Sequence, residues 1–115
     1  YVILSDSLKR IGDFAFFSDT TLVKVNVPEG QIGCCSFMGC SKLKDVKLGN
    51  VTVIGESAFL DCTSLCEITI PESVLEIRSE AFAGCSNLKV VRVTNRQTII
   101  ANNAFDSNTI IKYKN

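Results

Sequence analysis

The feature that most constrains the fold of this chain is an internal repeat with a period of 21 to 23 residues. It is marked by phenylalanines at successive spacings of 21, 22, 23 and 23 residues: Phe16, Phe37, Phe59, Phe82 and Phe105. Each follows a small residue and comes five residues after an isoleucine. The first four are followed by a leucine six residues later, and by apolar residues at nine and eleven. Such self-similarity is typical of a solenoid.

One unit of this repeat is too small to enclose a core. The part after the leucine alternates apolar and polar residues, as in EITI at 67–70, which predicts a short strand with one buried face. The part around the phenylalanine is too short for an isolated helix, so a single helical or 3₁₀ turn is expected there. Because each unit has one strand, it must stack on copies of itself. The result is a solenoid whose parallel strands lie about 4.8 Å apart.

The unit resembles a known repeat. Its fullest copy is IGESAFLDCTSLCEITIP at 54–71, and the pattern I-G-x-x-A-F-x-x-C-x-x-L-x-x-I-x-I-P is similar to the BspA-like class of leucine-rich repeat. The resemblance extends over essentially the whole chain. It implies an α/β repeat solenoid: a right-handed leucine-rich-repeat coil with a short parallel β-sheet on one face and short helical or 3₁₀ turns on the other.

The repeat frame organises all 115 residues as a single leucine-rich-repeat domain. A partial repeat occupies residues 1–10, with Ile3 on its strand, and further repeats begin near residues 11, 32, 54, 77 and 100. IIKY at 110–113 is interpreted as a fifth strand with one residue deleted, which aligns Tyr113 with the first strand valine of other units. The abrupt start YVIL indicates a fragment of a longer protein. An uncapped end predicts a larger parent protein or end-to-end self-association.

The composition argues against an enzyme. There is no histidine, the commonest general base and metal ligand, and no G-x-S-x-G, G-x-G-x-x-G or phosphate-binding glycine loop. We therefore predict no catalytic residues, no cofactor and no metal site. Lys plus Arg and Asp plus Glu are both 12, so no net charge attracts nucleic acid. No apolar run approaches the roughly 18 residues of a membrane span, and no membrane insertion is expected.

The six cysteines fall into two groups. The first group lies three residues after a phenylalanine, at an inward position: Cys40, Cys62 and Cys85. They are predicted to be small buried hydrophobes whose S–H groups reach a neighbouring backbone carbonyl, with a disulfide within the stack as the alternative. The second group lies off this stack: Cys34, Cys35 and Cys66. We interpret these as surface thiols, with a redox pair of Cys34 and Cys35 as the alternative.

The outward-pointing strand residues are the candidate binding surface. In a solenoid such positions form one continuous face. They carry charges of both signs and are Lys24, Asn26, Asp45, Lys47, Glu67, Thr69, Val90 and Arg92. Mixed charge on a flat or concave face favours recognition of a protein, although solvated strand positions without a function have the same composition. The face lacks the aromatic clusters on which nucleic-acid bases stack.

Two functions are compatible with this surface. BspA-like proteins are largely microbial surface or secreted proteins, so the resemblance implies a non-enzymatic protein–protein interaction module. It would be adhesive, located outside the cell or at the cell surface, with a host or matrix protein as its partner. The alternative is a structural spacer or scaffold segment that carries another domain and has no ligand. Charge reversal on the strand face separates the two hypotheses, because only the first needs those side chains for binding.

Overall fold

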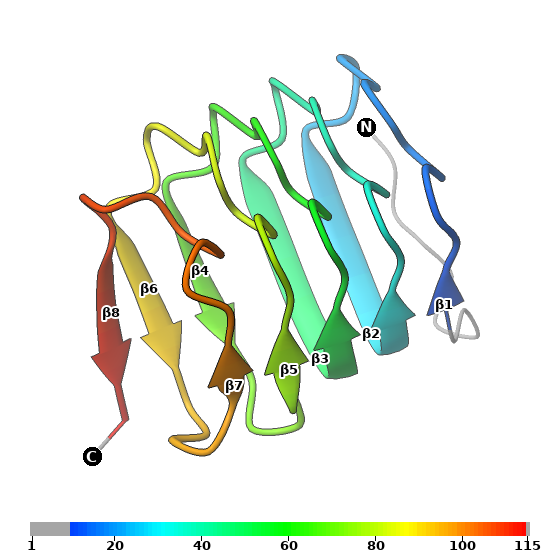
Figure 1. Ribbon diagram of the computed structural model, residues 1–115. Helices are drawn as coiled ribbons and strands as arrows, with labels where there is room; N and C mark the ends of the chain where they lie inside the picture. Colours follow the sequence, from blue (N-terminus) through cyan, green and yellow to red (C-terminus); the bar gives the residue numbers. More distant parts are fainter. Residues whose placement is uncertain (1–9, 115) are drawn as a thin grey trace.

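The fold was analysed in a computed structural model that describes residues 10–114. Except for Arg10, the partial repeat expected at the N-terminus, including Ile3, lies outside the described residues. The chain winds in successive coils that stack side by side (Figure 1). Its strands are β1 (Arg10–Ile11), β2 (Lys24–Ile32), β3 (Asp45–Ile54), β4 (Glu67–Ile70), β5 (Glu76–Ile77), β6 (Val90–Val93), β7 (Ile99–Ile100) and β8 (Ile110–Tyr113).

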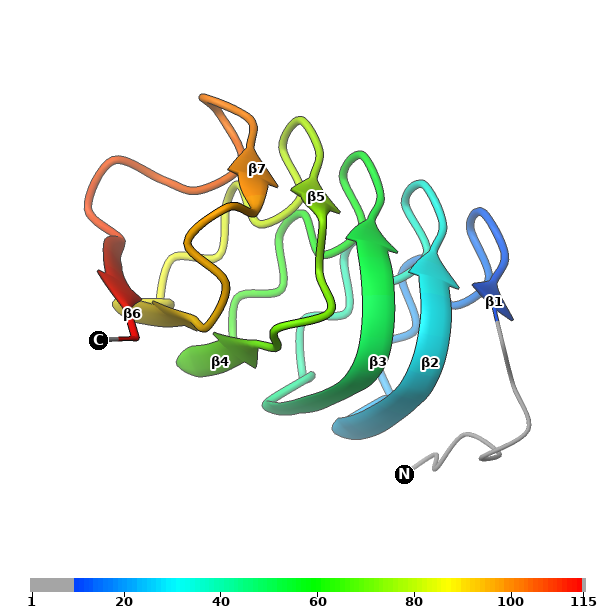
Figure 2. The same cartoon turned by 90° about the horizontal axis from the view of Figure 1, so that it is seen from below.

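The strands form two parallel sheets on adjoining sides of the coil. One sheet has the order β1-β2-β3-β5-β7 and the other has the order β4-β6-β8. β2 and β3 are long and bend from one side of the coil to the other (Figure 2). The predicted parallel-strand solenoid is therefore confirmed. The repeated isoleucines form a second side of paired strands, which the repeat pattern did not predict.

The length of the connection between the two sides decides whether a strand is continuous. From the second buried strand position to the isoleucine that ends the unit, β2 advances five residues, from Val27 to Ile32. The equivalent advance is six residues in β3 and seven in the next two units. In the third unit the longer connection folds into a turn, in which the Val74 N–H donates to the Pro71 carbonyl oxygen at 3.1 Å. Consequently β4 and β5 are separate strands.

The prediction of a face of short helical or 3₁₀ turns is wrong, because residues 10–114 contain no helix. Every second N–H in the turns donates to the next coil, as those of Ser57, Phe59 and Asp61 do at 3.0, 2.7 and 2.9 Å. The intervening N–H groups of Ala58 and Leu60 donate three residues back along the chain. Ser57 and Asp61 also have φ angles of 56° and 61°, which a right-handed helix does not allow. The turns are therefore a chain of tight corners tied to their neighbours.

Stacked phenylalanines form the centre of the core, which we call the Phe spine: Phe16, Phe37, Phe59, Phe82 and Phe105. Successive ring centroids are 5.3, 5.1, 5.1 and 5.0 Å apart, and neighbouring ring planes differ by no more than 7°. The three inner rings are buried. One aromatic ring per unit thus contacts its equivalent in the next unit, as the stacking of similar units requires.

A second column, formed by the inward cysteines, lies beside the Phe spine. The thiols of Cys40, Cys62 and Cys85 donate to phenylalanine carbonyl oxygens of the preceding unit at 3.2, 3.2 and 3.1 Å. All three residues are buried and their thiols are free. The prediction that they are small buried donors is confirmed. Burial raises the pKa of the Cys40 thiol to about 11.

The remaining cysteines lie nearer the surface. Cys66 is exposed, whereas Cys34 and Cys35 are partly buried with their Sγ atoms 3.3 Å apart. Burial raises the pKa of the Cys35 thiol to about 11, and a thiol with a raised pKa is a weak nucleophile at neutral pH. This argues against the alternative of a redox pair of Cys34 and Cys35.

The alignment of the last strand needs a correction. β8 pairs with β6 so that Ile111 lies beside Val91, and the alignment of Tyr113 with that position is therefore wrong. Ile111 follows Phe105 by six residues where Val91 follows Phe82 by nine. The last unit is thus shorter by three residues rather than by one.

Candidate functional site

The strand face is the outward surface of residues 24–27, 45–48, 67–70, 90–93 and 110–113. On β2 and β3 the register places Lys24 beside Asp45 and Asn26 beside Lys47. Each lysine therefore has an acidic or amide side chain as its neighbour on the adjoining strand. Among the described residues, the Oδ1 atom of Asn26 is buried and has no hydrogen-bond partner.

The other part of the strand face is formed by β4, β6 and β8. Here Glu67 lies beside Val90, and Thr69 lies beside Arg92. Arg92 in turn lies beside Lys112 on β8. Lys112 was not among the predicted site residues, although both the predicted and the observed alignment of β8 give it an outward position.

The strand face is interrupted between β3 and β4. Over residues 45–48, the edge of β3 that faces away from β2 has no strand partner within residues 10–114, and β4 is an edge strand of its own sheet. The two units are joined at both ends of this gap. The Ser64 hydroxyl donates to the Ser41 carbonyl oxygen at 2.6 Å, and the Ser73 hydroxyl donates to the Val51 carbonyl oxygen at 2.7 Å. The gap is therefore tied at its ends and unpaired between them.

The position of the gap follows from the lengths of the connections. β2 and β3 have short connections and run as continuous, bent strands, whereas β4 ends at Ile70 and is followed by a turn. A strand that bends around the corner and a strand that stops before it cannot keep the same path. The strands separate between β3 and β4, because the connection that follows Leu48 has six residues and the one that follows Ile70 has seven.

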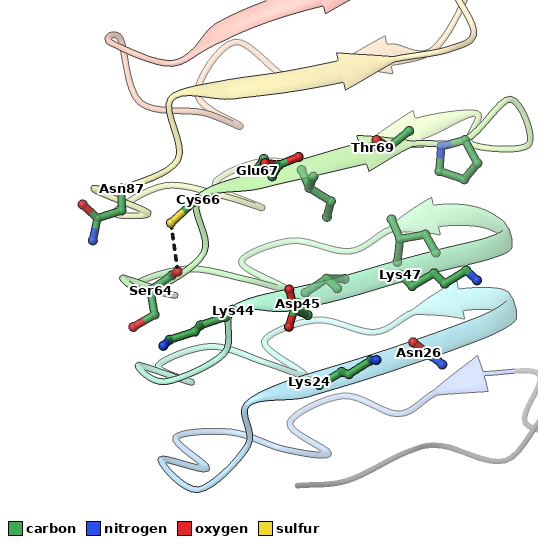
Figure 3. Close-up of a pocket in the computed structure, with 14 residues that line it drawn as sticks. Lys24, Asn26, Lys44, Asp45, Lys47, Ser64, Cys66, Glu67, Thr69 and Asn87 are labelled. Atoms are coloured by element: carbon green, nitrogen blue, oxygen red, sulfur yellow. Dashed lines mark hydrogen bonds between the residues drawn. The ribbon is translucent and has the colours of Figure 1, made fainter.

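An open groove of about 1130 Å³ lies over this gap (Figure 3), and we call it the β3–β4 groove. Six of the eight predicted site residues line it: Lys24, Asn26, Asp45, Lys47, Glu67 and Thr69. Val90 and Arg92 lie outside it, on β6. The structure thus brings most of the predicted residues around one concave feature instead of along one continuous surface.

The floor of the β3–β4 groove is apolar. Val46, Leu48 and Ile68 line it. Val46 and Leu48 are partly exposed, whereas their equivalents on β2, Val25 and Val27, are 0% and 1% exposed. The gap therefore uncovers side chains that the repeat buries elsewhere. Sequence reasoning assigned Val46 and Leu48 to the core and missed this floor.

The rim of the groove carries charges that no ion pair holds. Lys44 lines it in addition to the predicted lysines, and Figure 3 shows Lys24, Asp45 and Glu67 on three successive strands. Within residues 10–114, ion pairs join only Arg10 to Asp13 and Arg78 to Glu76, both away from the groove. Lys44 and Cys66 hold the same repeat position and both line the groove. Neither was among the site residues predicted from the sequence.

A smaller hollow of about 260 Å³ lies at the C-terminal end of the strand face. Arg92, Lys112 and Tyr113 line it, and the Arg96 guanidinium lies 5.4 Å from the centroid of the Tyr113 ring. This end of the face is therefore basic, in contrast to the mixed charge around the β3–β4 groove.

The described part of the chain holds no group of three or more His, Cys, Asp or Glu side chains placed to bind a metal ion. Nor does the part of the chain that the structure describes contain a helix of the length and hydropathy that a membrane crossing requires. What the strand face offers a ligand is charged side chains, uncovered apolar side chains and unpaired strand edges.

Stacked coils with a shared Phe spine and a face of parallel strands define a leucine-rich-repeat solenoid. The sequence matches the family model for the BspA type leucine rich repeat region, with six copies over residues 1–112. The chain belongs to this family, and the resemblance identified from the repeat motif is confirmed. No curated protein matches the sequence.

Solved structures of bacterial repeat proteins are similar to this one. A leucine rich cell surface protein from Faecalibacterium prausnitzii is 30% identical with a TM-score of 0.80, and the match covers 99% of this chain and 32% of that one. A leucine-rich repeat protein from Bacteroides capillosus is 29% identical with a TM-score of 0.67, covering 100% and 77%. One from Bacteroides ovatus is 27% identical with a TM-score of 0.58, covering 99% and 42%. The chain thus spans about a third of the length of the first of these proteins.

Proposed function

We propose that this chain is a non-enzymatic protein-binding module whose contact surface is the strand face, centred on the β3–β4 groove. The observation that carries the proposal is the groove itself, in which uncovered Val46 and Leu48 are surrounded by charged side chains. An apolar centre with a polar rim is the usual arrangement of a protein interface. Concave apolar surface that the fold leaves uncovered is also a common mark of an interaction site.

Adhesion at a cell surface is the finer part of the same proposal. It is supported by membership of the BspA type repeat family and by the 30% identity to a protein described as a cell surface protein. The partner would be a protein exposed on a host cell or in an extracellular matrix. We also propose that the chain is one segment of a longer protein, because its match covers only 32% of that relative.

The test is a binding assay of the wild-type protein against intact cells and a panel of matrix proteins. The variant Lys24→Glu/Lys47→Glu/Arg92→Glu reverses three charges of the strand face. The matched control Arg10→Glu/Lys42→Glu/Arg78→Glu reverses three exposed charges that line neither hollow. Circular dichroism establishes that both variants fold.

The proposal predicts saturable binding that the strand-face variant loses and the control variant keeps. Equal binding by both variants would move the contact surface elsewhere on the coil. If the wild-type protein bound no member of the panel, the result would favour the alternative of a spacer segment with no ligand of its own.

A further inference from the structure

We infer that the smaller hollow at the C-terminal end of the strand face binds an acidic segment of the protein partner. We call it the basic hollow, because Arg92, Lys112 and Lys114 line it. The inference rests on the proposed function and adds the chemistry of one contact with the partner. Three observations support it: a pair of like charges in the sheet, further cations around that pair, and a described lining without carboxylates.

The register of β6 and β8 places two cations beside each other. These strands are neighbours at the C-terminal end of the coil (Figure 1), and Arg92 lies beside Lys112 with both side chains exposed. Like charges on neighbouring strands repel each other, which lowers the stability of a sheet. The other charged residues of the described strand pairs on this face lie beside an opposite or neutral side chain: Lys24 beside Asp45, Lys47 beside Asn26, and Glu67 beside Val90. An anion bound between Arg92 and Lys112 would remove their repulsion.

Two further cations lie next to this pair. Lys114 follows Lys112 by two residues, and its N–H donates to the Val93 carbonyl oxygen at 3.0 Å, so the chain keeps its parallel path up to this residue. The Arg96 guanidinium lies over the ring of Tyr113, which also lines the basic hollow. Four of the 12 Lys and Arg residues of the chain therefore gather at this place.

The positive charge of the basic hollow is not neutralised by its surroundings. No Asp or Glu of the described residues lines the hollow, and the two ion pairs within residues 10–114 involve none of the four cations. The hydroxyl-bearing side chains of Thr69 and Thr94 line it as well, and a hydroxyl group can donate a hydrogen bond to an anion. Clustered charge of one sign in a hollow raises the local concentration of oppositely charged groups.

The size of the hollow and the charges beside it favour a short acidic segment over a long polyanion. Its volume of about 260 Å³ is below the roughly 300–1,000 Å³ of ligand pockets, so one or two side chains fit. Glu67 lies two residues before Thr69 on β4, and Asp45 lies on β3. A chain of sulfate or phosphate groups that continued from the hollow along the strand face would meet these carboxylates and be repelled.

The positions of the cations set the spacing of the acidic residues. Lys112 and Lys114 hold alternate positions along the chain, and Arg92 lies beside Lys112 on the next strand. In an extended segment, side chains at alternate positions lie on one side, roughly 7 Å apart. One carboxylate therefore binds between Lys112 and the planar guanidinium of Arg92, which suits bidentate binding, and the next reaches Lys114. The favoured order is acidic, any residue, acidic.

The test is an NMR titration of the isotope-labelled whole protein with end-blocked peptides. The acidic probe is Gly-Glu-Ser-Glu-Gly, and the neutral control is Gly-Gln-Ser-Gln-Gly. We expect the probe to shift the amide signals of Arg92, Lys112 and Lys114, and the control to bind about tenfold more weakly. A second control, Gly-Glu-Glu-Ser-Gly, should also bind more weakly than the probe, because adjacent side chains of an extended segment point to opposite sides.

A protein variant tests which residues bind the probe. Arg92→Gln/Lys112→Gln/Lys114→Gln removes three charges of the basic hollow at exposed positions, and should bind the acidic probe about tenfold more weakly than the wild-type protein. Because the repulsion between Arg92 and Lys112 is also removed, this variant should unfold at the same temperature as the wild-type protein or a higher one. A loss of binding then does not result from unfolding.

The matched control Arg10→Gln/Lys42→Gln/Arg78→Gln removes three exposed charges that line neither hollow. It should bind the acidic probe as the wild-type protein does. Equal losses in the two variants, or equal affinity of the wild-type protein for the acidic and neutral peptides, would overturn the inference. Dextran sulfate serves as a polyanion probe. If the basic-hollow variant lost binding of dextran sulfate while the wild-type protein did not bind the acidic peptide, the ligand would be a polyanion and the inference would fail.

The outcome for the basic hollow and the outcome for the proposed function are separable. If the strand-face variant loses binding to cells or matrix proteins while the wild-type protein does not bind the acidic probe, the proposed function stands and the inference fails. If the wild-type protein selects the acidic probe through the basic hollow but binds no cell or matrix protein, the inference stands and the adhesive role fails.

Discussion

Replacement of Phe59 by alanine tests whether the Phe spine holds the coils together. The ring is 0% exposed and stacks on Phe37 and Phe82, with both centroid distances at 5.1 Å. The variant removes the middle ring of the five and leaves a cavity between two others. The backbone carbonyl that accepts the Cys85 thiol remains in place, so the change is confined to packing.

The expected loss of stability is large. Truncation of a buried phenylalanine to alanine costs about 3–5 kcal/mol, and each stacked aromatic pair contributes about 0.5–1.5 kcal/mol beyond burial. Because Phe59 is stacked on both sides, we expect the upper half of that range, about 4–5 kcal/mol. This is a large part of the roughly 5–15 kcal/mol by which a domain is stable.

Urea denaturation followed by circular dichroism measures the effect, with two further variants as controls. Phe105→Ala removes a partly buried ring that stacks on one side only, and should cost about half as much. Phe17→Ala removes a ring that is 48% exposed and lies outside the spine, and should cost less than about 1 kcal/mol. Equal losses for Phe59→Ala and Phe17→Ala would refute the role of the spine.

Three further predictions concern the cysteines and the close approach of two coils. The pKa of the Cys40 thiol is raised from 9.0 to about 11, so the folded state holds this proton more tightly than the unfolded state. The free energy of unfolding should therefore fall as the pH rises from about 9 to about 11. Urea titrations at pH 8 and 10.5 measure this difference, which the Cys40→Ala variant should reduce. Ellman's reagent should label the exposed Cys66 rapidly in the native protein and the three stacked cysteines only after unfolding, a prediction that equal rates would contradict. Gly49→Ala should destabilise the protein by about 1–3 kcal/mol, because an added Cβ would overlap the Pro28 carbonyl oxygen. Gly12→Ala should not destabilise it, because no atom lies within 4 Å of the added Cβ. Thermal unfolding of the two variants tests this difference.

The repeat predicted the core because the same physical constraint acts in every unit. Phe59 and Cys62 recur at fixed positions, and a side chain that stacks on its own equivalent must point inward in all units. The repeat pattern was therefore enough to predict the parallel-strand solenoid and the buried thiols, and it marks the residues of the Phe spine. It also placed Lys24 and Asp45 on the same outward face.

The turns and the groove depend on properties that the pattern does not contain. The positive φ of Ser57 results from hydrogen bonds to the next coil, and serine itself has no strong preference for that conformation. Val46 holds the same repeat position as the buried Val25, yet it is partly exposed because the neighbouring strand β4 takes another path. The lengths of the connections, six residues after Leu48 and seven after Ile70, indicate where the strands separate. An alignment based on the phenylalanines does not compare these lengths.

The measurement that tests the central claim most directly is residue-resolved amide hydrogen exchange of β3. If the sheet is open between β3 and β4, the amides of Val46 and Leu48 should exchange at least about tenfold faster than that of Lys47, which faces β2, because only the former lack an acceptor. Equal protection of these three amides in the free protein would mean that β3 and β4 are paired and that no groove exists.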